Sequence, residues 1–354
     1  MVFDNYKEIA FVGTRHQLNI LEAILRQQGR KLEDIDVIVT ISDTKLNVKN
    51  ELHIPPIVTK VSDLYGIKEK LINLISSIKS ELDSKYISYF SNDNNLLVQL
   101  MINDTDCVFS EMMEDGLGSY LPRVRPFWGK KNIKSYVYHF LLSLIFKNKY
   151  KYNPRYYFGQ YTRASRYWAL SANCFPLVTN VQLIKPENYI NIISRGSGLQ
   201  TNQFLKKTTS DTLIYVESPL VEDRIISRHD YFVYLNEKFE SFCEKFALHK
   251  ILIKTHPRSN MKVMMELKQF LSEKNPNLLF EICDESFNFE SVLINLIQDK
   301  VYISSLLSSS IFYSNVLFGQ NERVFYLDGS DLNIFLIDDF QRLLKSIAPK
   351  VLFI

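Results

Sequence analysis

The sequence predicts two α/β domains, each built from a parallel sheet with helices on both faces. Short buried strands alternate with amphipathic helices in the first third of the chain, and the alternation returns after residue 212. A chain of 354 residues is also too long for one compact core. The composition is 46% hydrophobic and 23% charged with 11 Gly and 11 Pro, which excludes collagen-like and disordered classes.

The first third gives the clearest periodicities. Residues 9–13 (IAFVG) and 35–42 (IDVIVTIS) read as strands, and residues 18–29 between them have apolar residues at helical spacing. Ser62 is placed to cap a helix whose apolar face comprises Leu64, Ile67, Leu71, Leu74, Ile78 and Leu82. The alternation continues through segments 86–92, 96–102 and 107–111. This pattern is typical of a parallel sheet that is covered on both faces.

The pattern stops after Tyr120 and a basic, aromatic stretch begins. Residues 116–186 contain no Asp or Glu but twelve Lys and Arg, so the rest of the chain carries +3 − 12 = −9. We expect a helix at about 132–147, and the segregated charge implies an anionic partner. Residues 121–190 are therefore predicted to be a helical insertion or linker that contacts a membrane surface or a dimer partner, with a plain structural linker as the alternative.

Strands recur in the last part of the chain. They are expected at 212–217, 250–255, 277–282, 300–304 and 323–327, with helices between them. The predicted domains are 1–120, an N-terminal acceptor-side domain, and 191–331, a nucleotide-sugar domain. A C-terminal helix in 332–354 is expected to pack back on the first domain. Two such domains facing a central cleft suit a two-part substrate, because ligands bind at the carboxyl ends of parallel strands.

Adjacent carboxylates follow the strand at 107–111. Glu114 and Asp115 precede Gly116 in a turn. One of two adjacent carboxyl groups can have a raised pKa, which suits a general base near neutral pH. The alternative is a solvated acidic turn. Thr14, His16 and Gln17 follow the first strand and, with Gly116, are candidates for contacting an acceptor.

A histidine and a proline follow the strand at 250–255. Pro257 biases His256 toward extended geometry. Lys254 and Arg258 flank the pair and favour an anion there. His256 is therefore a candidate to donate a proton or a hydrogen bond to a departing phosphate, and the alternative is an ordinary loop histidine.

Serines close the strand at 300–304 and run into a helix. Helix-start amides and the hydroxyls of Ser308, Ser309 and Ser310 together suit phosphate, although such serines also cap helices. Upstream, Asn288 and Glu290 lie near another helix start. Glu290 is placed to hold ribose hydroxyls or simply to complement the helix dipole.

Other features bear on metal and location. The four cysteines lie far apart, which fits a reducing cytosol, and the apolar run 136–146 is shorter than the about 20 residues that span a bilayer. The N-terminus lacks the pattern of a signal peptide. The DxD pattern at Asp104–Asp106 precedes a strand and reads as a turn, so no metal is expected.

The ordered set of EDG, HP and a serine pair resembles the bacterial sialyltransferases, which have the GT-B fold and use CMP-sialic acid. The segment EDGLGSY is most similar to glycosyltransferase family 52, the lipooligosaccharide and capsule sialyltransferases. The resemblance implies an inverting, metal-independent sialyltransferase that acts on a galactose-terminated lipooligosaccharide or capsular glycan. It also implies a peripheral protein at the inner face of the cell membrane, a homodimer and no nucleic-acid partner.

The resemblance also assigns roles. Asp115 or Glu114 would deprotonate the acceptor hydroxyl, and His256 would assist departure of CMP. Some family members use an aspartate nearer the HP motif, so Asp223 and Asp230 are alternative bases. The implied donor-binding set is Lys254, Pro257, Arg258, Asn288, Glu290, Ser308, Ser309 and Ser310.

Three other functions fit parts of the pattern. Another GT-B transferase would use a different CMP-ulosonic acid or a UDP-sugar, and a UDP donor would usually depend on metal. A non-catalytic, membrane-docked protein would bind nucleotide or glycan without turnover. A single-strand nucleic-acid binder would show steep salt dependence.

Overall fold

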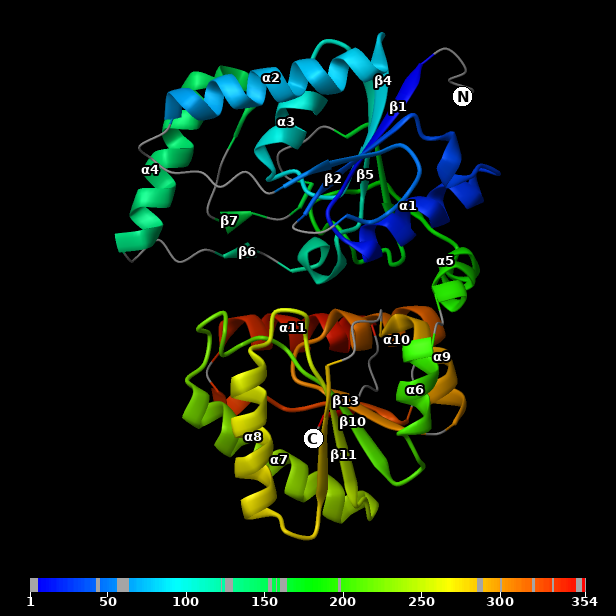
Figure 1. The fold of residues 1–354 in the computed structure, drawn as a ribbon, viewed down its shortest axis with the longest axis vertical. Helices are drawn as coiled ribbons and strands as arrows, with labels where there is room; N and C mark the ends of the chain where they lie inside the picture. The colour runs from blue at the N-terminus through cyan, green and yellow to red at the C-terminus, as the bar shows by residue number, and fades with distance from the viewer. Residues whose placement is uncertain are drawn as a thin grey trace. The chain divides into compact units, whose positions relative to one another are not determined.

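The computed structural model describes residues 6–42, 45–55, 64–121, 123–124, 130–151, 155–156, 158–159, 164–196, 199–284, 289–299, 301–319, 322–332, 334–347 and 352–353. The chain divides into two compact units, Met1–Ile192 and Ile193–Ile354 (Figure 1). Each unit contains one large sheet in which every strand pair is parallel.

The first sheet has seven strands in the order β3-β2-β1-β4-β5-β8-β9. Their bounds are β1 Lys7–Val12, β2 Val37–Ile41, β3 Glu51–Ile54, β4 Tyr86–Phe90, β5 Cys107–Met113, β8 Arg166–Ala169 and β9 Val181–Leu183. The order reverses at the boundary between β1 and β4. Ligands bind at such a reversal in open parallel sheets, beyond the carboxyl ends of the strands. We call that end of a sheet its carboxyl edge.

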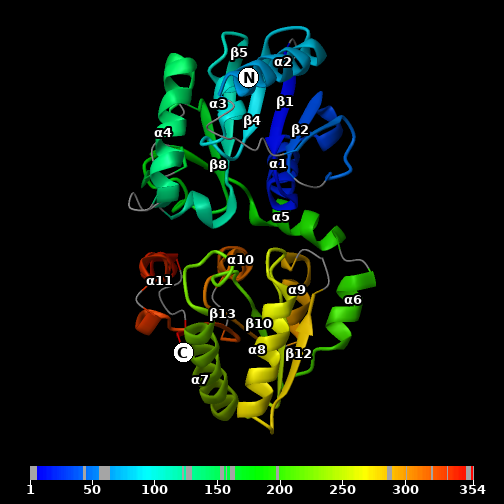
Figure 2. The same ribbon diagram turned by 60° about the vertical axis from the view of Figure 1, so that its left-hand side comes forward.

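Helices cover both faces of this sheet. The helices of the first unit are α1 Arg15–Gln27, α2 Leu64–Leu82, α3 Leu96–Ile102, α4 Lys130–Ile145 and α5 Pro186–Ile193. The hydroxyl of Thr14 caps α1 by accepting from the Gln17 amide, and α1 buries an apolar face that includes Leu18, Leu21 and Leu25. Figures 1 and 2 show α1 on one face and α2 with α3 on the other, as right-handed crossovers require.

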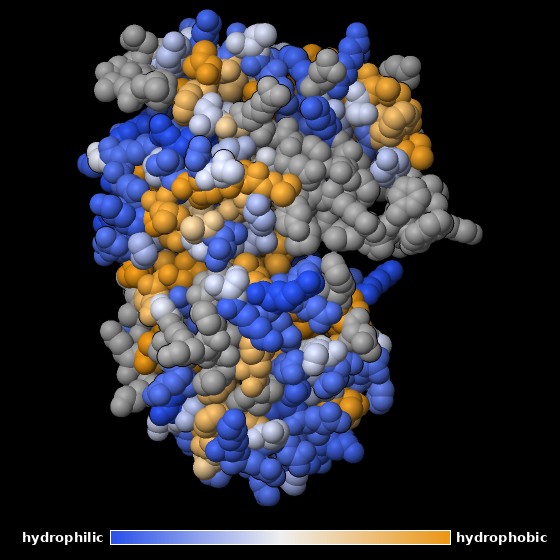
Figure 3. Space-filling view, turned by 180° about the vertical axis from the view of Figure 1, so that it is seen from behind, coloured by the Kyte–Doolittle hydropathy of each residue, from blue (hydrophilic) through white to orange (hydrophobic). Residues whose placement is uncertain are grey.

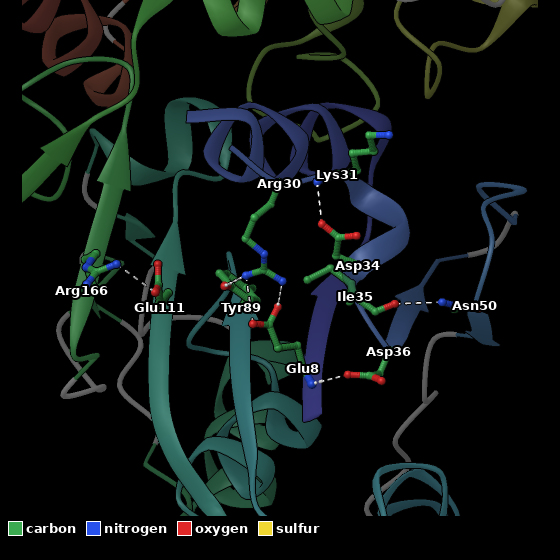
Figure 4. Close-up of polar contacts among 10 residues, drawn as sticks. All are labelled: Glu8, Arg30, Lys31, Asp34, Ile35, Asp36, Asn50, Tyr89, Glu111 and Arg166. Atoms are coloured by element: carbon green, nitrogen blue, oxygen red, sulfur yellow. Dashed lines mark hydrogen bonds and ion pairs between the residues drawn. The ribbon is translucent and has the colours of Figure 1, made fainter. Parts of the chain in front are cut away.

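A charged network lies across one face of the first sheet (Figure 4). Arg30 donates to both carboxylate oxygens of Glu8, at 2.9 and 2.6 Å, and Arg166 donates to Glu111 at 3.2 Å. The indole of Trp168 also donates to Glu111, whose side chain is 2% exposed. These bonds tie β8 to β5, because Arg166 and Trp168 both belong to β8.

The basic stretch therefore contributes to the first sheet. Within 121–190, where we expected a helical insertion or linker, β8 and β9 extend the sheet and α4 provides the helix predicted at 132–147. Strands of four and three residues are too short to show a period in the sequence. Two short strands of the same stretch, β6 Arg123–Val124 and β7 Arg155–Tyr156, pair antiparallel in a separate two-stranded sheet.

The second sheet has six strands in the order β12-β11-β10-β13-β14-β15. Each strand expected between residues 212 and 327 is present, with the bounds β10 Thr212–Val216, β11 Lys250–Lys254, β12 Leu279–Cys283, β13 Tyr302–Ser305 and β14 Val324–Tyr326. The sixth strand, β15 Leu352–Phe353, was not predicted. The order reverses between β10 and β13, so the central strand β10 ends at the reversal.

The helices of the second unit are α6 Leu199–Lys206, α7 Arg228–Phe246, α8 Met261–Lys274, α9 Glu290–Gln298, α10 Ser309–Phe318 and α11 Phe335–Ile347. The core between the sheet, α7 and α8 is rich in aromatic rings, including Tyr215, Phe239 and Phe242. Figures 1 and 2 show α7 and α8 on one face of the sheet and α6 with α9 on the other.

The C-terminal segment belongs to the second unit. Segment 332–354, for which we expected a helix packed on the N-terminal domain, supplies α11 and the edge strand β15. Ile337 of α11 is buried in the core of the second unit. Within the described ranges, no helix is long and apolar enough to cross a membrane. All four cysteines are free thiols.

Candidate functional site

The predicted donor-binding residues gather at the carboxyl edge of the second sheet. Lys254 ends β11, and residues His256–Asn260, which we call the HP loop, lead from it into α8. Ser308 and Ser309 stand where β13 turns into α10, and Glu290 begins α9. The strands β11 and β13 flank β10, so these groups surround the reversal in strand order.

The His256 ring has a defined tautomer. The backbone N–H of Arg258 donates to His256 Nδ1 at 3.1 Å, so the proton of the neutral ring resides on Nε2. Burial lowers the pKa of His256 to about 4, and the nearby cations Arg258 and Lys254 act in the same direction. At neutral pH the free protein thus presents an uncharged imidazole whose Nε2–H is a hydrogen-bond donor.

The two alternative bases near the HP loop have other partners. Asp223 makes a two-bond ion pair with the Arg258 guanidinium, at 2.7 and 3.1 Å. Asp230 lies in the first turn of α7 and accepts from the hydroxyl of Ser227, the residue that caps that helix, at 2.6 Å. Asp223 therefore anchors the loop that carries His256, and Asp230 serves a helix start.

Glu290 and Lys254 are the buried charged residues of this edge. Both side chains are buried, and the Lys254 ammonium donates to the Thr255 carbonyl at 2.9 Å. Burial raises the pKa of Glu290, while a hydrogen bond from Ser310 and the charge of Lys254 oppose that rise. Ser308 is buried at the start of α10, and its hydroxyl makes no capping bond to that helix.

The predicted donor-binding set also includes Pro257 and Asn288. Pro257 lies in the exposed turn of the HP loop and supplies shape rather than a polar group. Asn288 lies outside the described residues.

Sequence reasoning missed Glu217, which follows the central strand β10. Its side chain is 2% exposed. Its Oε2 accepts from the His256 amide at 3.1 Å and from the Ser259 hydroxyl, and Oε1 has no hydrogen-bond partner in the described part of the chain. Burial raises the pKa of Glu217 to about 7. The available signal was a carboxylate at a strand's carboxyl end, but Glu217 reads as the last residue of the strand itself.

A second polar group gathers at the carboxyl edge of the first sheet. Asp115 follows β5, and its carboxylate accepts from the side chain of Gln17, which comes from the start of α1. Gln17 also accepts from the Gly13 amide, and the Asp115 amide donates to Ser119 at 2.7 Å. Gly116 has φ +70°, the left-handed region that favours glycine. Thus Thr14, Gln17, Asp115 and Gly116 lie at one edge of the first sheet, and their contact with an acceptor stays a prediction.

The adjacent acid, Glu114, points into the protein. Its side chain is fully buried, and one carboxylate oxygen accepts from the Tyr120 hydroxyl at 3.1 Å and from the Leu170 amide at 2.7 Å. These bonds join the turn after β5 to the residue after β8. Glu114 therefore has a structural position, and Asp115, which is only partly buried, is the more accessible of the two acids.

His16, another candidate for contacting an acceptor, packs against α5. The residue as a whole is half-buried, but Nε2 is buried and Nδ1 lies 2.9 Å from the Tyr189 hydroxyl in α5. Burial lowers the pKa of His16 to about 4. Its neighbour Thr14 is exposed.

The DxD pattern takes part in ion pairs. Asp104 lies 3.0 Å from the Lys79 ammonium and 3.4 Å from that of Lys149, and Asp106 also pairs with Lys79. Both acids precede β5, at the edge of the sheet opposite to Asp115. Among the described residues, no three His, Cys, Asp or Glu side chains are grouped to hold a metal ion.

Comparison with known proteins assigns the chain to a family. The model of the alpha-2,8-polysialyltransferase (POLYST) family matches residues 6–326. The chain belongs to the alpha-2,8-polysialyltransferase family. The predicted membership of a sialyltransferase family is thus confirmed, and the finer likeness to family 52 stays a prediction. No curated protein matches the chain by sequence.

Solved structures of similar fold include UDP-GlcNAc 2-epimerases from two organisms. The Methanocaldococcus jannaschii enzyme has 14% identity and a TM-score of 0.53, over 96% of this chain and 92% of that one. The Rickettsia bellii enzyme has 12% identity and a TM-score of 0.52, over 98% and 88%. These similarities confirm the predicted fold, a GT-B type with two Rossmann-like domains. The family match supports a glycosyltransferase.

Proposed function

We propose that the protein transfers sialic acid from CMP-sialic acid to a glycan. The single observation that carries the donor assignment is the grouping of His256, Lys254, Glu290 and the start of α10 at one sheet edge. A helix start and a neutral imidazole N–H suit a single phosphate, and a buried carboxylate suits ribose hydroxyls. Membership of the polysialyltransferase family supports the sugar.

The leaving group requires charge stabilisation. As the bond between the sugar C2 and the phosphate oxygen breaks, the electron pair stays on the phosphate, whose charge goes from −1 to −2. His256 donates from Nε2 to that oxygen, and Ser309 and the amides of α10 donate to the others, while Ser310 donates to Glu290. Because Nδ1 accepts from the Arg258 amide, the ring stays neutral, keeps its proton and stabilises the departing CMP by the hydrogen bond from Nε2.

The acceptor hydroxyl loses its proton to Asp115 in this proposal. Asp115 is the accessible member of the EDG pair, whereas Glu114 is engaged in buried hydrogen bonds. Asp223 and Asp230 are the weaker choices because an ion pair and a helix cap occupy them. Direct attack by the acceptor oxygen at C2 inverts that centre, and no step requires a metal ion.

Two acceptors compete. The sequence resemblance implied a galactose-terminated glycan, whereas an α2,8 linkage joins one sialic acid to another. The acid-free stretch 116–186, with its twelve Lys and Arg, favours an anionic glycan, so we propose a sialylated acceptor. The test is incubation with CMP-sialic acid and equal amounts of lactose, sialyllactose and oligosialic acid, with products measured by mass spectrometry. Elongation of lactose alone would restore the galactose-terminated acceptor.

The helix α4 supports a membrane-surface location. Val137, Phe140 and Leu144 recur at helical spacing and are 47%, 54% and 58% exposed. In Figure 3, which is turned by 180° from Figure 1, α4 lies at the right of the first unit, where a small hydrophobic cluster is seen. An apolar stripe within a basic, acid-free segment is typical of helices that rest on anionic lipid. We therefore propose that α4 docks on the inner face of the cell membrane.

Vesicle flotation tests this location. The protein should float with vesicles containing anionic phosphatidylglycerol and remain behind with pure phosphatidylcholine. Phe140→Asp should reduce flotation about tenfold, and Ile72→Asp, at an exposed position of α2, should not. Equal flotation of wild type and Phe140→Asp would remove α4 from membrane docking.

A further inference from the structure

Three carboxylates on one loop hold the HP loop. The segment Glu217–Asp223, which we call the acidic loop, follows the central strand β10. Its acids bind the HP loop at successive positions: Glu217 accepts from the His256 amide and the Ser259 hydroxyl, Glu222 accepts from the Asn260 amide at 2.8 Å, and Asp223 pairs with Arg258.

These contacts govern the His256 ring through its neighbours. Glu217 fixes the backbone of His256, and Asp223 fixes the side chain of Arg258, whose own amide donates to His256 Nδ1. That last bond selects the tautomer with hydrogen on Nε2. Without it, neither the ring orientation nor the proton position has a restraint from the HP loop.

The acidic loop also reaches the phosphate side of the edge. The Ser218 hydroxyl donates to the Leu307 carbonyl in the turn between β13 and α10. Glu217 itself stands at the reversal between β10 and β13. One short segment thus contacts both the loop that carries His256 and the turn that carries Ser308.

We propose that Glu217 is the positioning residue for His256, acting through the HP loop rather than by contact with the substrate. This inference rests on the proposed function for its kinetic consequence. Its structural consequence, the tautomer and orientation of His256, can be measured without any substrate.

The ionisation of Glu217 makes its hydrogen bonds to the HP loop sensitive to pH. Burial raises its pKa to about 7, so the carboxylate is the main form above that pH and the neutral acid below it. The carboxylate is the stronger acceptor for the His256 amide and the Ser259 hydroxyl. The hydrogen bonds from the HP loop to Glu217 should therefore strengthen as pH rises through about 7. The titratable and charged groups near Glu217 are Glu222, Arg258, His256, Tyr215 and Tyr231.

The first test is histidine ¹⁵N NMR on the full chain at pH 7.5. The chain has six histidines, and His256→Ala identifies the His256 signal. Wild type should show the Nε2–H tautomer at His256, and Glu217→Ala should show a mixture of tautomers. An unchanged Nε2–H signal in Glu217→Ala would overturn the proposal, whether or not the protein turns over CMP-sialic acid.

The second test separates positioning from stability with Glu217→Gln. Because the folded-state pKa is raised from 4.5, the charged residue lowers stability as pH rises from about 4.5 to 7, and the amide removes that loss. The Tm of Glu217→Gln should therefore equal or exceed that of wild type at pH 8. Its kcat should nevertheless fall about tenfold while CMP binding changes little, because an amide oxygen is a weaker acceptor than the carboxylate for the His256 amide and the Ser259 hydroxyl, so the HP loop is positioned less firmly.

Glu111→Gln is the matched control, since Glu111 is equally buried, has a raised pKa and lies in the first unit. It should leave kcat unchanged. Wild-type kcat should rise with pH through about 7, and Glu217→Gln should lack that rise. A Glu217→Gln protein with kcat within twofold of wild type and the same pH profile would contradict the proposal. Absence of turnover in wild type would instead refute the proposed function, and the NMR result would still decide the role of Glu217.

Discussion

His16 and His256 stand at comparable places in the two sheets, just beyond the carboxyl ends of β1 and β11. In both, the pKa is lowered to about 4. The causes differ. Burial alone acts on His16, whereas Arg258 and Lys254 reinforce burial at His256 and acids of the neighbouring loop oppose it.

The difference teaches that a shifted pKa does not by itself identify a functional histidine. His16 has its Nδ1 against Tyr189 and its Nε2 buried, so its ring belongs to the packing between α1 and α5. His256 sits on a loop with cations around it, and a bond from Arg258 to Nδ1 places its proton on Nε2. An anion would change the second site and leave the first unaffected.

The largest expected effect is that of His256→Ala. Turnover should fall at least ~100-fold, because the donor to the departing phosphate is lost, while the fold is kept. Initial rates and circular dichroism measure the two quantities. His16→Gln is the control and should retain turnover within about threefold. Near-normal turnover in His256→Ala would remove that residue from the mechanism.

The next effect distinguishes the two acids of the first edge. Asp115→Asn should reduce kcat about 100-fold with an unchanged Tm, because the amide cannot take the acceptor proton. Glu114→Gln should keep kcat near normal, since one side-chain oxygen can still accept from Tyr120 and Leu170. The reverse pattern, with Glu114→Gln inactive and Asp115→Asn active, would make Glu114 the base.

A smaller effect is expected from the ion pair that anchors the HP loop. Asp223→Asn should lower kcat about threefold and barely change Tm, because the pair is exposed and such pairs contribute about 0.2–1 kcal/mol. Stopped assays and thermal melts at two salt concentrations give both values. A 100-fold loss with normal folding would instead favour Asp223 as the catalytic base.

The smallest effect on activity is expected from His16→Gln, which should instead change how stability depends on pH. Its folded-state pKa is about 4 against 6.5, so the stability present above pH 6.5 is lost as pH falls toward 4. On going from pH 7 to pH 5, wild type should lose about 1–2 kcal/mol more of its free energy of unfolding than His16→Gln does. Urea unfolding at the two pH values measures this. Equal pH dependence in both proteins would show that His16 is not desolvated.

The sequence predicted most of the fold because most strands and helices of the two units are long enough to show their hydrophobic periodicity. It did not predict β8 and β9, which are short and pair with strands distant in the sequence or with each other. Side-chain bonds from Arg166 and Trp168 to Glu111 also join β8 to β5. A bond between distant positions leaves no local pattern.

The site was predictable in part for the same reason. Carboxyl ends of strands and starts of helices are readable, so the positions of His256 and Asp115 beyond strands and of Glu290 at a helix start could be predicted. The burial of Glu114 and the bonds of Glu217 to the HP loop depend on tertiary contacts across 39 to 56 residues, and these could not be read.

The central claim is tested most directly by release of CMP from CMP-sialic acid with EDTA present, with and without oligosialic acid and lactose. We expect acceptor-stimulated release that EDTA leaves unchanged, with oligosialic acid the better acceptor. CMP binding without stimulated release by any glycan would contradict catalysis and favour a binding protein. No CMP binding, with binding of UDP instead, would contradict the donor assignment and indicate a UDP-sugar.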